Sequence, residues 1–92
     1  MSDEKVARRL RLRGRVQGVF FRSEVKREAA DRGVSGSAAN RPDGSVEILL
    51  EGGAPDVEAV ISFCAHGPPG ARVSHIEVEK CPPQGLTGFD IR

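Results

Sequence analysis

The sequence predicts an α+β fold in which two helices pack on one face of an antiparallel-type sheet. Two observations carry this prediction. Apolar residues alternate with polar ones in some segments and recur at helical spacing in others, and the segments follow in the order strand, helix, strand, strand, helix, strand. With 92 residues, 38% of them hydrophobic, the chain can form one modest core. We therefore expect a single domain over residues 1–92, with a flexible N-terminus at residues 1–5.

The first strand and the first helix flank the stretch GRVQGVFFR. In ARRLRLRG, just before it, Leu10 and Leu12 fall on one face of a strand and arginines on the other. After it, apolar residues at every fourth position from Phe21 to Ala29, with charged residues between them, predict a short amphipathic helix. Gly33 provides the signal that ends this helix.

A β-hairpin is expected next. GSAAN leads into RPDGS, whose Pro-Asp-Gly sequence favours a turn. In the following SVEILLEG, Val46, Ile48 and Leu50 fall on one face, with Glu47 and Glu51 on the other, as in a half-buried strand. The two segments are therefore expected to form the second and third strands, joined by a tight turn.

The second helix is expected to begin near Pro55, because proline is favoured at helix starts. Its apolar residues, Val57, Val60, Ile61 and Cys64, repeat at helical spacing until HGPPG breaks the pattern. ARVSHIEVEK then alternates as a fourth strand, and the tail LTGFDIR is expected to add a short edge strand. This order is the split βαβ arrangement of the ferredoxin-like fold, with both helices on one face of the sheet and water on the other.

Charges are nearly balanced, with 14 basic and 13 acidic residues, so no overall field attracts the chain to nucleic acid or anionic lipid. The local basic stripe of Arg9, Arg11 and Arg13 should share the open face with Glu47 and Glu51, which would pair with it. The alternative is a sheet that binds single-stranded RNA. Such sheets usually stack bases on aromatic side chains, whereas the phenylalanines fall elsewhere and Trp and Tyr are absent. We therefore expect no nucleic-acid partner.

The cellular context follows from what the sequence lacks. No apolar run approaches the ~20 residues that span a bilayer, and the start MSDEKVARR has no apolar signal core, so we expect a cytoplasmic protein without membrane contact. Cys64 and Cys81 are then expected to be reduced thiols. His66 and His75 have no third ligand at metal spacing and are expected at the surface. We expect a monomer that needs no metal or other cofactor.

The stretch GRVQGVFFR carries the main functional hypothesis. It ends on Arg22 at a helix start, where peptide dipoles disfavour a cation, so an anion is expected beside it. A glycine-bearing loop lets N–H groups meet a phosphate, and a guanidinium offers forked donors to two of its oxygens. The alternative is a tight turn with a solvated arginine. The predicted phosphate-binding residues are Arg15, Val16, Gln17, Gly18, Val19, Phe20, Phe21 and Arg22.

Asn40 is the second candidate site residue, late in the second strand and just before the turn. Its carboxamide can donate to a phosphoryl oxygen and accept from a water molecule, which is what orienting a nucleophilic water requires. The alternative is that Asn40 makes an Asx turn leading into Pro42, Asp43 and Gly44.

Two longer patterns resemble the signatures of the acylphosphatase family. LRGRVQGVFFR, from Leu12 to Arg22, is similar without exception to the first signature, a hydrophobic residue followed by Gly-x-Val-Gln-Gly-Val-x-Phe-Arg. The second signature resembles the segment from Gly36 to Gly52. Its matching positions are Gly36, Ala38, Asn40, Gly44, Val46 and Gly52. The likeness continues through GPPGARV to Gly88 and Phe89, and so covers nearly the whole chain.

The resemblance implies an activity as well as a fold. The implied reaction is hydrolysis of the mixed anhydride in an acyl phosphate, which gives a carboxylate and inorganic phosphate without a metal. By correspondence of motif, Arg22 binds the phosphate and Asn40 orients the water. The chain departs from the family at Ser37, where an aromatic residue is usual, and at Ala39, where a long polar residue is usual. A family member that binds phosphate but turns over little is therefore a further alternative.

Overall fold

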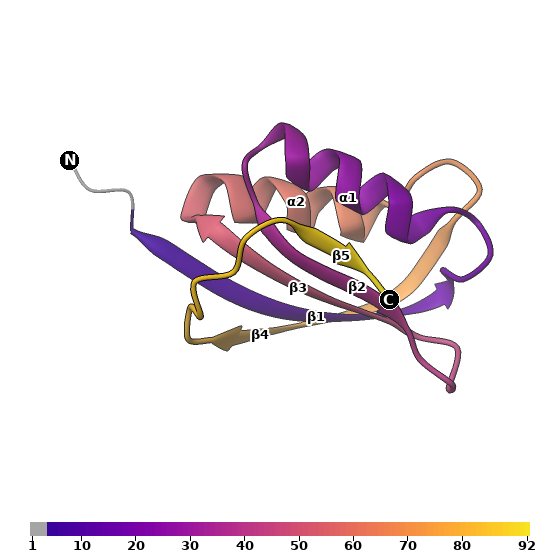
Figure 1. Ribbon diagram of the computed structural model, residues 1–92. Coiled ribbons are helices and arrows are strands. Elements are labelled where there is room, and N and C mark those ends of the chain that lie inside the picture. The colour runs from indigo at the N-terminus through magenta and orange to yellow at the C-terminus, as the bar shows by residue number, and fades with distance from the viewer. Residues whose placement is uncertain (1–3) are drawn as a thin grey trace.

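The computed structural model of the chain describes residues 4–92, and its elements follow the predicted order (Figure 1). They are β1 (Lys5–Arg15), α1 (Phe21–Asp31), β2 (Ser35–Asn40), β3 (Val46–Gly53), α2 (Ala54–His66), β4 (Arg72–Cys81) and β5 (Phe89–Ile91). Of the N-terminal segment expected to be flexible, residues 1–3 lie outside the described part, and β1 begins at Lys5. Within residues 4–92, no helix combines the length and apolar character needed to cross a membrane.

The strands form one sheet in the order β4-β1-β3-β2-β5, and both helices lie on the same face of it (Figure 1). Neighbouring strands are antiparallel except at one edge, where β2 and β5 pair in parallel from Gly36 opposite Phe89 to Ala38 opposite Ile91. The ferredoxin-like α+β prediction is confirmed, and the short C-terminal strand extends the sheet beyond β2.

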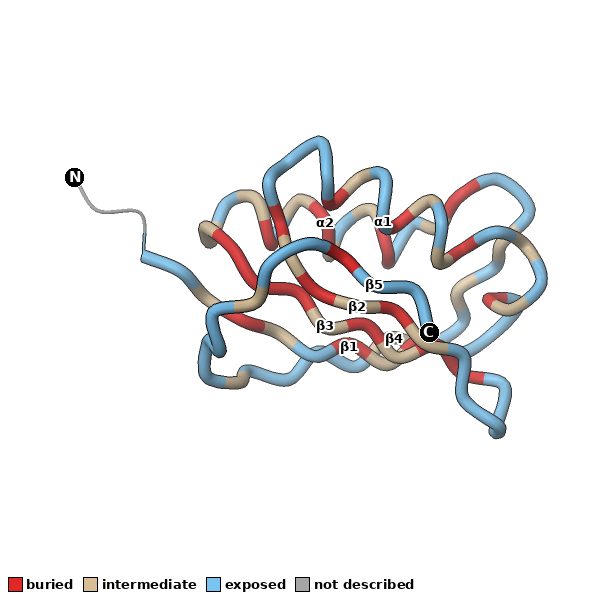
Figure 2. The backbone as a smooth tube through the Cα atoms, in the orientation of Figure 1, coloured by how far each residue is buried: buried red, intermediate tan, exposed pale blue. Residues whose placement is uncertain are grey.

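The core lies between the sheet and the helices, and buried residues alternate with more exposed ones along the central strands (Figure 2). The predicted apolar faces of β1, α1, β3 and α2 are buried: Leu10, Leu12, Phe21, Val25, Ala29, Val46, Ile48, Leu50, Val57, Val60 and Cys64. Ile61 is only partly buried at the rim of this core. Phe21 is 1% exposed, and burial of such a side chain contributes roughly 2–3 kcal/mol. It anchors the first turn of α1 and thereby fixes the position of Arg22.

A bulge at the end of β1 directs the chain toward α1. The register of β1 against β4 shifts between Arg13 and Gly14. Gly14 has a φ of 122°, and a Cβ atom there would lie 2.2 Å from the backbone oxygen of Arg72. Only glycine fits at this close approach, because its φ is positive and the backbone of β4 leaves no room for a side chain. The bulge therefore positions the loop that follows it.

Candidate active site

The loop that joins β1 to α1 spans residues 16–20, and the sign of its backbone φ angle alternates from Gly18 to Phe20. Gly18 has a φ of 73° and Phe20 a φ of 59°, whereas Val19 between them has negative φ. Such alternation turns successive N–H groups to one side and forms a concave nest that binds anions. Within residues 4–92, Phe20 is the one residue other than glycine with positive φ. The loop therefore has the backbone form of an anion-binding nest.

The N–H groups of this loop and of the first turn of α1 lack protein acceptors. The first N–H of α1 that forms a hydrogen bond is that of Glu24, which donates to the backbone oxygen of Phe20 at 3.1 Å. Within the described residues 4–92, the N–H groups of residues 17–23 donate to no backbone or side-chain acceptor. They stand at the electropositive end of the helix, where an anion is stabilised.

A hollow of about 210 Å³ lies against this loop, between the start of α1 and the end of β2. Its lining residues are Val16, Gly18, Phe20, Phe21, Arg22, Ser23 and Asn40. The structure thus brings the two candidate side chains, Arg22 and Asn40, to one hollow beside the loop. Ser23 was not predicted, and its only signal in the sequence is a hydroxyl in the first turn of the helix.

Arg22 is the second residue of α1 and is half-buried. Its Nη1 donates to the backbone oxygen of Arg92, just beyond β5, at 2.5 Å. A guanidinium carries five N–H donors in a planar fork, so this single bond leaves donors available on the side of the hollow. Asn40, at the end of β2, is exposed.

Three predicted phosphate-binding residues do not line the hollow. Arg15 ends β1 opposite Arg72 of β4, and Val19 packs against the core. Gln17 turns its side chain away, toward the turn between β2 and β3. These residues are predicted to bind phosphate through their backbone N–H groups. Those of Gln17 and Val19 have no acceptor within the described residues and so are available to a ligand.

The side chain of Gln17 ties the loop to the hairpin that carries Asn40. Its Nε2 donates to the backbone oxygens of Arg41 and Ser45, each at 2.9 Å. These two oxygens bracket the turn, and the N–H of Arg41 also donates to the oxygen of Ser45 at 2.8 Å. The carboxamide therefore couples the position of the loop to the end of β2. Sequence reasoning missed this role.

Asp43 organises the turn that follows Asn40. Its Oδ1 accepts from the N–H of Ser45 at 3.0 Å and from the Ser45 hydroxyl at 2.6 Å, and Arg13 donates to Oδ2 at 3.2 Å. The hydrogen bonds from Ser45, aided by the charge of Arg13, lower the pKa of Asp43 to about 2. The Asx turn considered for Asn40 is therefore made by Asp43. Within residues 4–92, the Asn40 carboxamide has no hydrogen-bond partner.

Among the described residues, the acidic, histidine and cysteine side chains lie away from the hollow, whose lining includes no carboxylate or histidine. His66 and His75 are exposed, as predicted. Cys64 is fully buried, and burial raises the pKa of its thiol to about 12. Cys81 is half-buried, and both cysteines are free thiols. Within residues 4–92, no three His, Cys, Asp or Glu side chains gather as metal ligands would.

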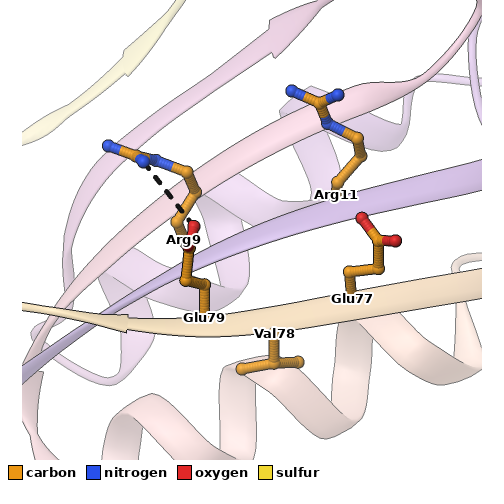
Figure 3. A pocket seen from close by; sticks show the side chains of 5 residues that line it. All are labelled: Arg9, Arg11, Glu77, Val78 and Glu79. Atoms are coloured by element: carbon orange, nitrogen blue, oxygen red, sulfur yellow. Dashed lines mark ion pairs between the residues drawn. The ribbon is translucent and has the colours of Figure 1, made fainter.

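The basic stripe on the open face of the sheet is paired with acidic groups. Arg9 lies 3.6 Å from Glu47 and 3.7 Å from Glu79, and Arg11 lies 4.0 Å from Glu47. Figure 3 shows both arginines extending from β1 beside the glutamates of β4. The predicted pairing with Glu47 is confirmed. A stripe neutralised in this way is a poor track for a nucleic-acid backbone.

The prediction that Glu51 also pairs with this stripe is wrong. Glu51 is 3% exposed, and its carboxylate accepts from the N–H groups of Gln84 at 2.7 Å, Gly85 at 2.8 Å and Leu86 at 3.1 Å. The connection from β4 to β5 covers the carboxylate and replaces water with its own backbone donors. These hydrogen bonds, led by that from Gln84, lower the pKa of Glu51.

Ser37 and Ala39, the two departures from the second signature, lie half-buried on the open face of β2. They line a separate hollow of about 380 Å³, and Asn40 is the residue that borders both hollows. Ala38, between them, is fully buried against the core. The departures therefore alter the face of the sheet opposite the helices, and the lining beside Arg22 is unaffected.

Similarity to known proteins points to one family. The family model described as acylphosphatase matches residues 8–91. An acylphosphatase from Thermococcus kodakarensis is 48% identical over 88 residues, which cover 96% of this chain and 97% of that protein. One from an Azoarcus species is 52% identical over 84 residues, covering 91% and 86%. The crystal structure of the Bacillus subtilis acylphosphatase has a TM-score of 0.91 at 36% identity, covering 95% of this chain and 98% of that chain. The chain therefore belongs to the acylphosphatase family and is a hydrolase of acyl phosphates.

Proposed function

We propose that acyl phosphates are hydrolysed in the hollow between the β1–α1 loop and the end of β2, without a metal ion. In this proposal Arg22 and the N–H groups of residues 17–23 bind the phosphoryl group, and Asn40 orients the attacking water. The observation that carries the assignment is the row of N–H groups without protein acceptors beside Arg22. Backbone donors that find no acceptor in the protein are available to an anionic ligand.

The phosphoryl end of the substrate needs positioned charge more than covalent chemistry. An acyl phosphate already has a good leaving group, so most of the required catalysis is orientation and electrostatic stabilisation. The fork of Arg22 suits two phosphoryl oxygens, and the loop N–H groups suit the third. These donors act most strongly where negative charge spreads over the phosphoryl oxygens in the transition state, and fixed donors need no reorganisation to do so.

Asn40 supplies the group that aligns the water. Its amide nitrogen can donate to a phosphoryl oxygen while its Oδ1 accepts from the water, and no hydrogen bond within residues 4–92 engages the carboxamide. The bonds from Gln17 to the hairpin keep the end of β2 at a fixed distance from the loop. A water held in line with the bond to be broken gains the benefit of proximity.

The reaction proceeds with balanced atoms and charge. The oxygen of water attacks phosphorus, the bond between phosphorus and the acyl oxygen breaks, and the carboxylate leaves with that electron pair. One proton of the water passes to the phosphate product. Because the lining includes no carboxylate or histidine, we assign a phosphoryl oxygen as the proton acceptor.

Hydrolysis of benzoyl phosphate with a chelator present tests this assignment. Arg22→Gln is expected to lower kcat/KM at least about 100-fold and to weaken inhibition by inorganic phosphate, because it removes a donor to the transferring group. Asn40→Ala is expected to lower kcat by a similar factor, again at least about 100-fold, with phosphate inhibition largely kept. Arg27→Gln, an exposed arginine on the same helix, is the matched control and should behave like the parent.

The outcomes separate the roles. Equal loss of phosphate inhibition in both site variants would contradict the division of labour between Arg22 and Asn40. Activity that disappears with the chelator and returns on adding a metal would contradict the metal-free mechanism. If the parent binds phosphate but does not hydrolyse benzoyl phosphate, the result would instead favour the alternative suggested by Ser37 and Ala39, a family member with impaired catalysis.

We also propose that residues 1–92 form a single domain and that the protein is a cytoplasmic monomer with no nucleic-acid partner. The free thiols of Cys64 and Cys81 suit a reducing compartment. The near balance of 14 basic and 13 acidic residues and the ion pairs of the arginine stripe give no field for nucleic acid. Sedimentation of the protein alone tests the monomer, and a dimer would contradict it. Sedimentation with single-stranded RNA tests the lack of a nucleic-acid partner, which a salt-sensitive complex would contradict.

A further inference from the structure

Phe20 and Phe21 are neighbours in the sequence with opposite surroundings. Phe21 is 1% exposed and packs in the core, whereas Phe20 is 80% exposed, more than any other large apolar residue in the described part of the chain. The ring of Phe20 is thus left in water, where an aromatic side chain loses the benefit of burial. Packing within the protein does not account for a phenylalanine at this position.

The backbone at Phe20 does not account for it either. Its φ of 59° and ψ of 25° lie in the left-handed region, which glycine adopts freely and asparagine more readily than other residues. Gly18, with a φ of 73°, meets the same demand two positions earlier without a side chain. A glycine at position 20 would therefore serve the nest at lower conformational cost. Since the chain carries a ring there, the ring itself needs an explanation outside the folded core.

The location of the ring suggests that it contacts the substrate. Phe20 lines the same hollow as Arg22 and Asn40. If the phosphoryl group is held by Arg22 and the loop N–H groups, the acyl group must extend from it toward solvent, past the residues at the mouth of the hollow. Of the apolar side chains in the lining, those of Val16 and Phe21 are each 1% exposed, so the ring of Phe20 is the apolar surface that the lining offers to an acyl group.

We propose that the ring of Phe20 contacts the acyl group of the substrate and makes the enzyme favour acyl phosphates with an aromatic acyl group over those with a small aliphatic one. This inference rests on the proposed function of the hollow. A flat aromatic acyl group can stack on the ring or meet its edge, and both arrangements add to the apolar area removed from water. An acetyl group is too small to cover the ring and gains little from it.

The test compares benzoyl phosphate with acetyl phosphate in the parent, Phe20→Asn and Phe20→Tyr. The measured quantity is the ratio of the two kcat/KM values, because a disturbance of the phosphate loop affects both substrates alike and cancels in the ratio. Asn tolerates the left-handed backbone but lacks a ring, and we expect the ratio to fall about 5- to 10-fold, as aromatic contacts predict. Tyr keeps the ring and should keep the ratio. Val78→Thr, at an exposed apolar residue on β4, is the matched control.

A ratio unchanged in Phe20→Asn would overturn the inference, whether both rates fall together or neither changes. A ratio that falls equally in Val78→Thr would overturn it as well, because the effect would then not be local to the hollow. Failure of the proposed function looks different, since the parent would then hydrolyse neither substrate, or Arg22→Gln would be as active as the parent.

Discussion

At each end of the sheet, successive backbone N–H groups lie close together, but the two ends differ in whether a carboxylate of the protein accepts their hydrogen bonds. At the end where β1 begins, the N–H groups of Gln84, Gly85 and Leu86 surround the buried carboxylate of Glu51 at 2.7 to 3.1 Å. At the end where β1 stops, the N–H groups of residues 17–23 have no acceptor in the described part of the chain. In Figure 1 the β4–β5 connection and the β1–α1 loop lie at opposite ends of the molecule.

A structural anion site and a ligand site share one design in this chain. Both use successive backbone donors, which stabilise a negative charge without a cation. At one end the charge is part of the chain, so the donors hold two segments together and serve stability. At the other end the charge must come from outside, so the donors serve binding. The two ends should therefore respond differently to mutation.

The largest expected effect is on stability, from Glu51→Gln. The neutral amide loses the charge-assisted bonds to three N–H groups and turns its own NH₂ toward donors, so we expect a loss of about 2 kcal/mol in the free energy of unfolding. For a domain of this size that corresponds to a fall in Tm of roughly 8–16 °C. Glu47→Gln, on the same face of β3, is the control and should cost less than Glu51→Gln, because the arginines that pair with Glu47 are 39% to 50% exposed and remain in water. A variant Glu51→Gln as stable as the parent would contradict the structural role of this end.

The next effect is on binding, from Gly18→Ala. The left-handed φ of 73° costs an alanine about 1–2 kcal/mol, so the nest should be partly lost and inhibition by inorganic phosphate weakened about 10-fold. Gly33→Ala is a close match, since its φ is 67° and, as at Gly18, no atom lies within 4 Å of the added Cβ. It should cost similar stability without changing phosphate inhibition. Equal effects of the two variants on inhibition would break the comparison.

Gln17→Ala tests whether the loop and the hairpin must be held together. The variant loses both bonds to the turn, and we expect kcat to fall about 5- to 10-fold, because Asn40 is then less well aligned, with phosphate inhibition changed less than twofold. Steady-state kinetics with inorganic phosphate as inhibitor measures both values. A loss of phosphate inhibition with kcat unchanged would mean that Gln17 supports the nest and has no influence on Asn40.

Acid should weaken the structural end first. The folded pKa of Glu51 is below its ordinary value, so its contribution to stability is present above about pH 4.5 and is lost as the pH falls through the folded pKa. The pKa of Asp43 is lowered to about 2, so its contribution to stability is present above about pH 4 and is lost as the pH falls toward 2. Urea unfolding between pH 7 and pH 2.5 should show this decline, and Glu51→Gln should show a shallower one. An equally steep decline in the variant would assign the acid sensitivity to other groups.

The smallest expected effect is the alkylation of the cysteine thiols in the folded protein. Burial raises the pKa of Cys64 to about 12, so almost no thiolate is present at pH 8, and alkylation in the folded protein should be confined to the half-buried Cys81. Mass spectrometry after treatment with iodoacetamide measures this, with the urea-unfolded protein as the control for both sites. Modification of Cys64 under native conditions would mean that the core opens readily.

The elements and the loop could be predicted because their signals are local. The alternation that buries Leu10 and Leu12, and the spacing that buries Phe21 and Val25, depend only on the repeat of strand or helix. The positive φ at Gly18 is likewise suggested by glycine itself. The position of Asn40 beside Arg22 followed from the resemblance to a family, since topology alone does not bring them to one hollow.

What could not be predicted depends on contacts between distant segments. The partners of Glu51 lie in the β4–β5 connection, and nothing in that stretch signals that its N–H groups will cover a carboxylate. The side chain of Gln17 finds backbone oxygens in the β2–β3 turn, and any residue type offers those, so no pattern marks them. The parallel pairing of β5 with β2 depends on where that connection crosses the sheet.

Titration of the isotope-labelled protein with inorganic phosphate, followed by amide NMR, tests whether the β1–α1 loop binds phosphate through its N–H groups. We expect the amide signals of residues 17–23 to shift as phosphate binds, because their N–H groups gain acceptors, and those of residues 84–86, already bonded to Glu51, to stay unchanged. Arg22→Gln should weaken the binding. Shifts confined to the arginine stripe on the open face, with the signals of residues 17–23 unchanged, would contradict phosphate binding at the loop.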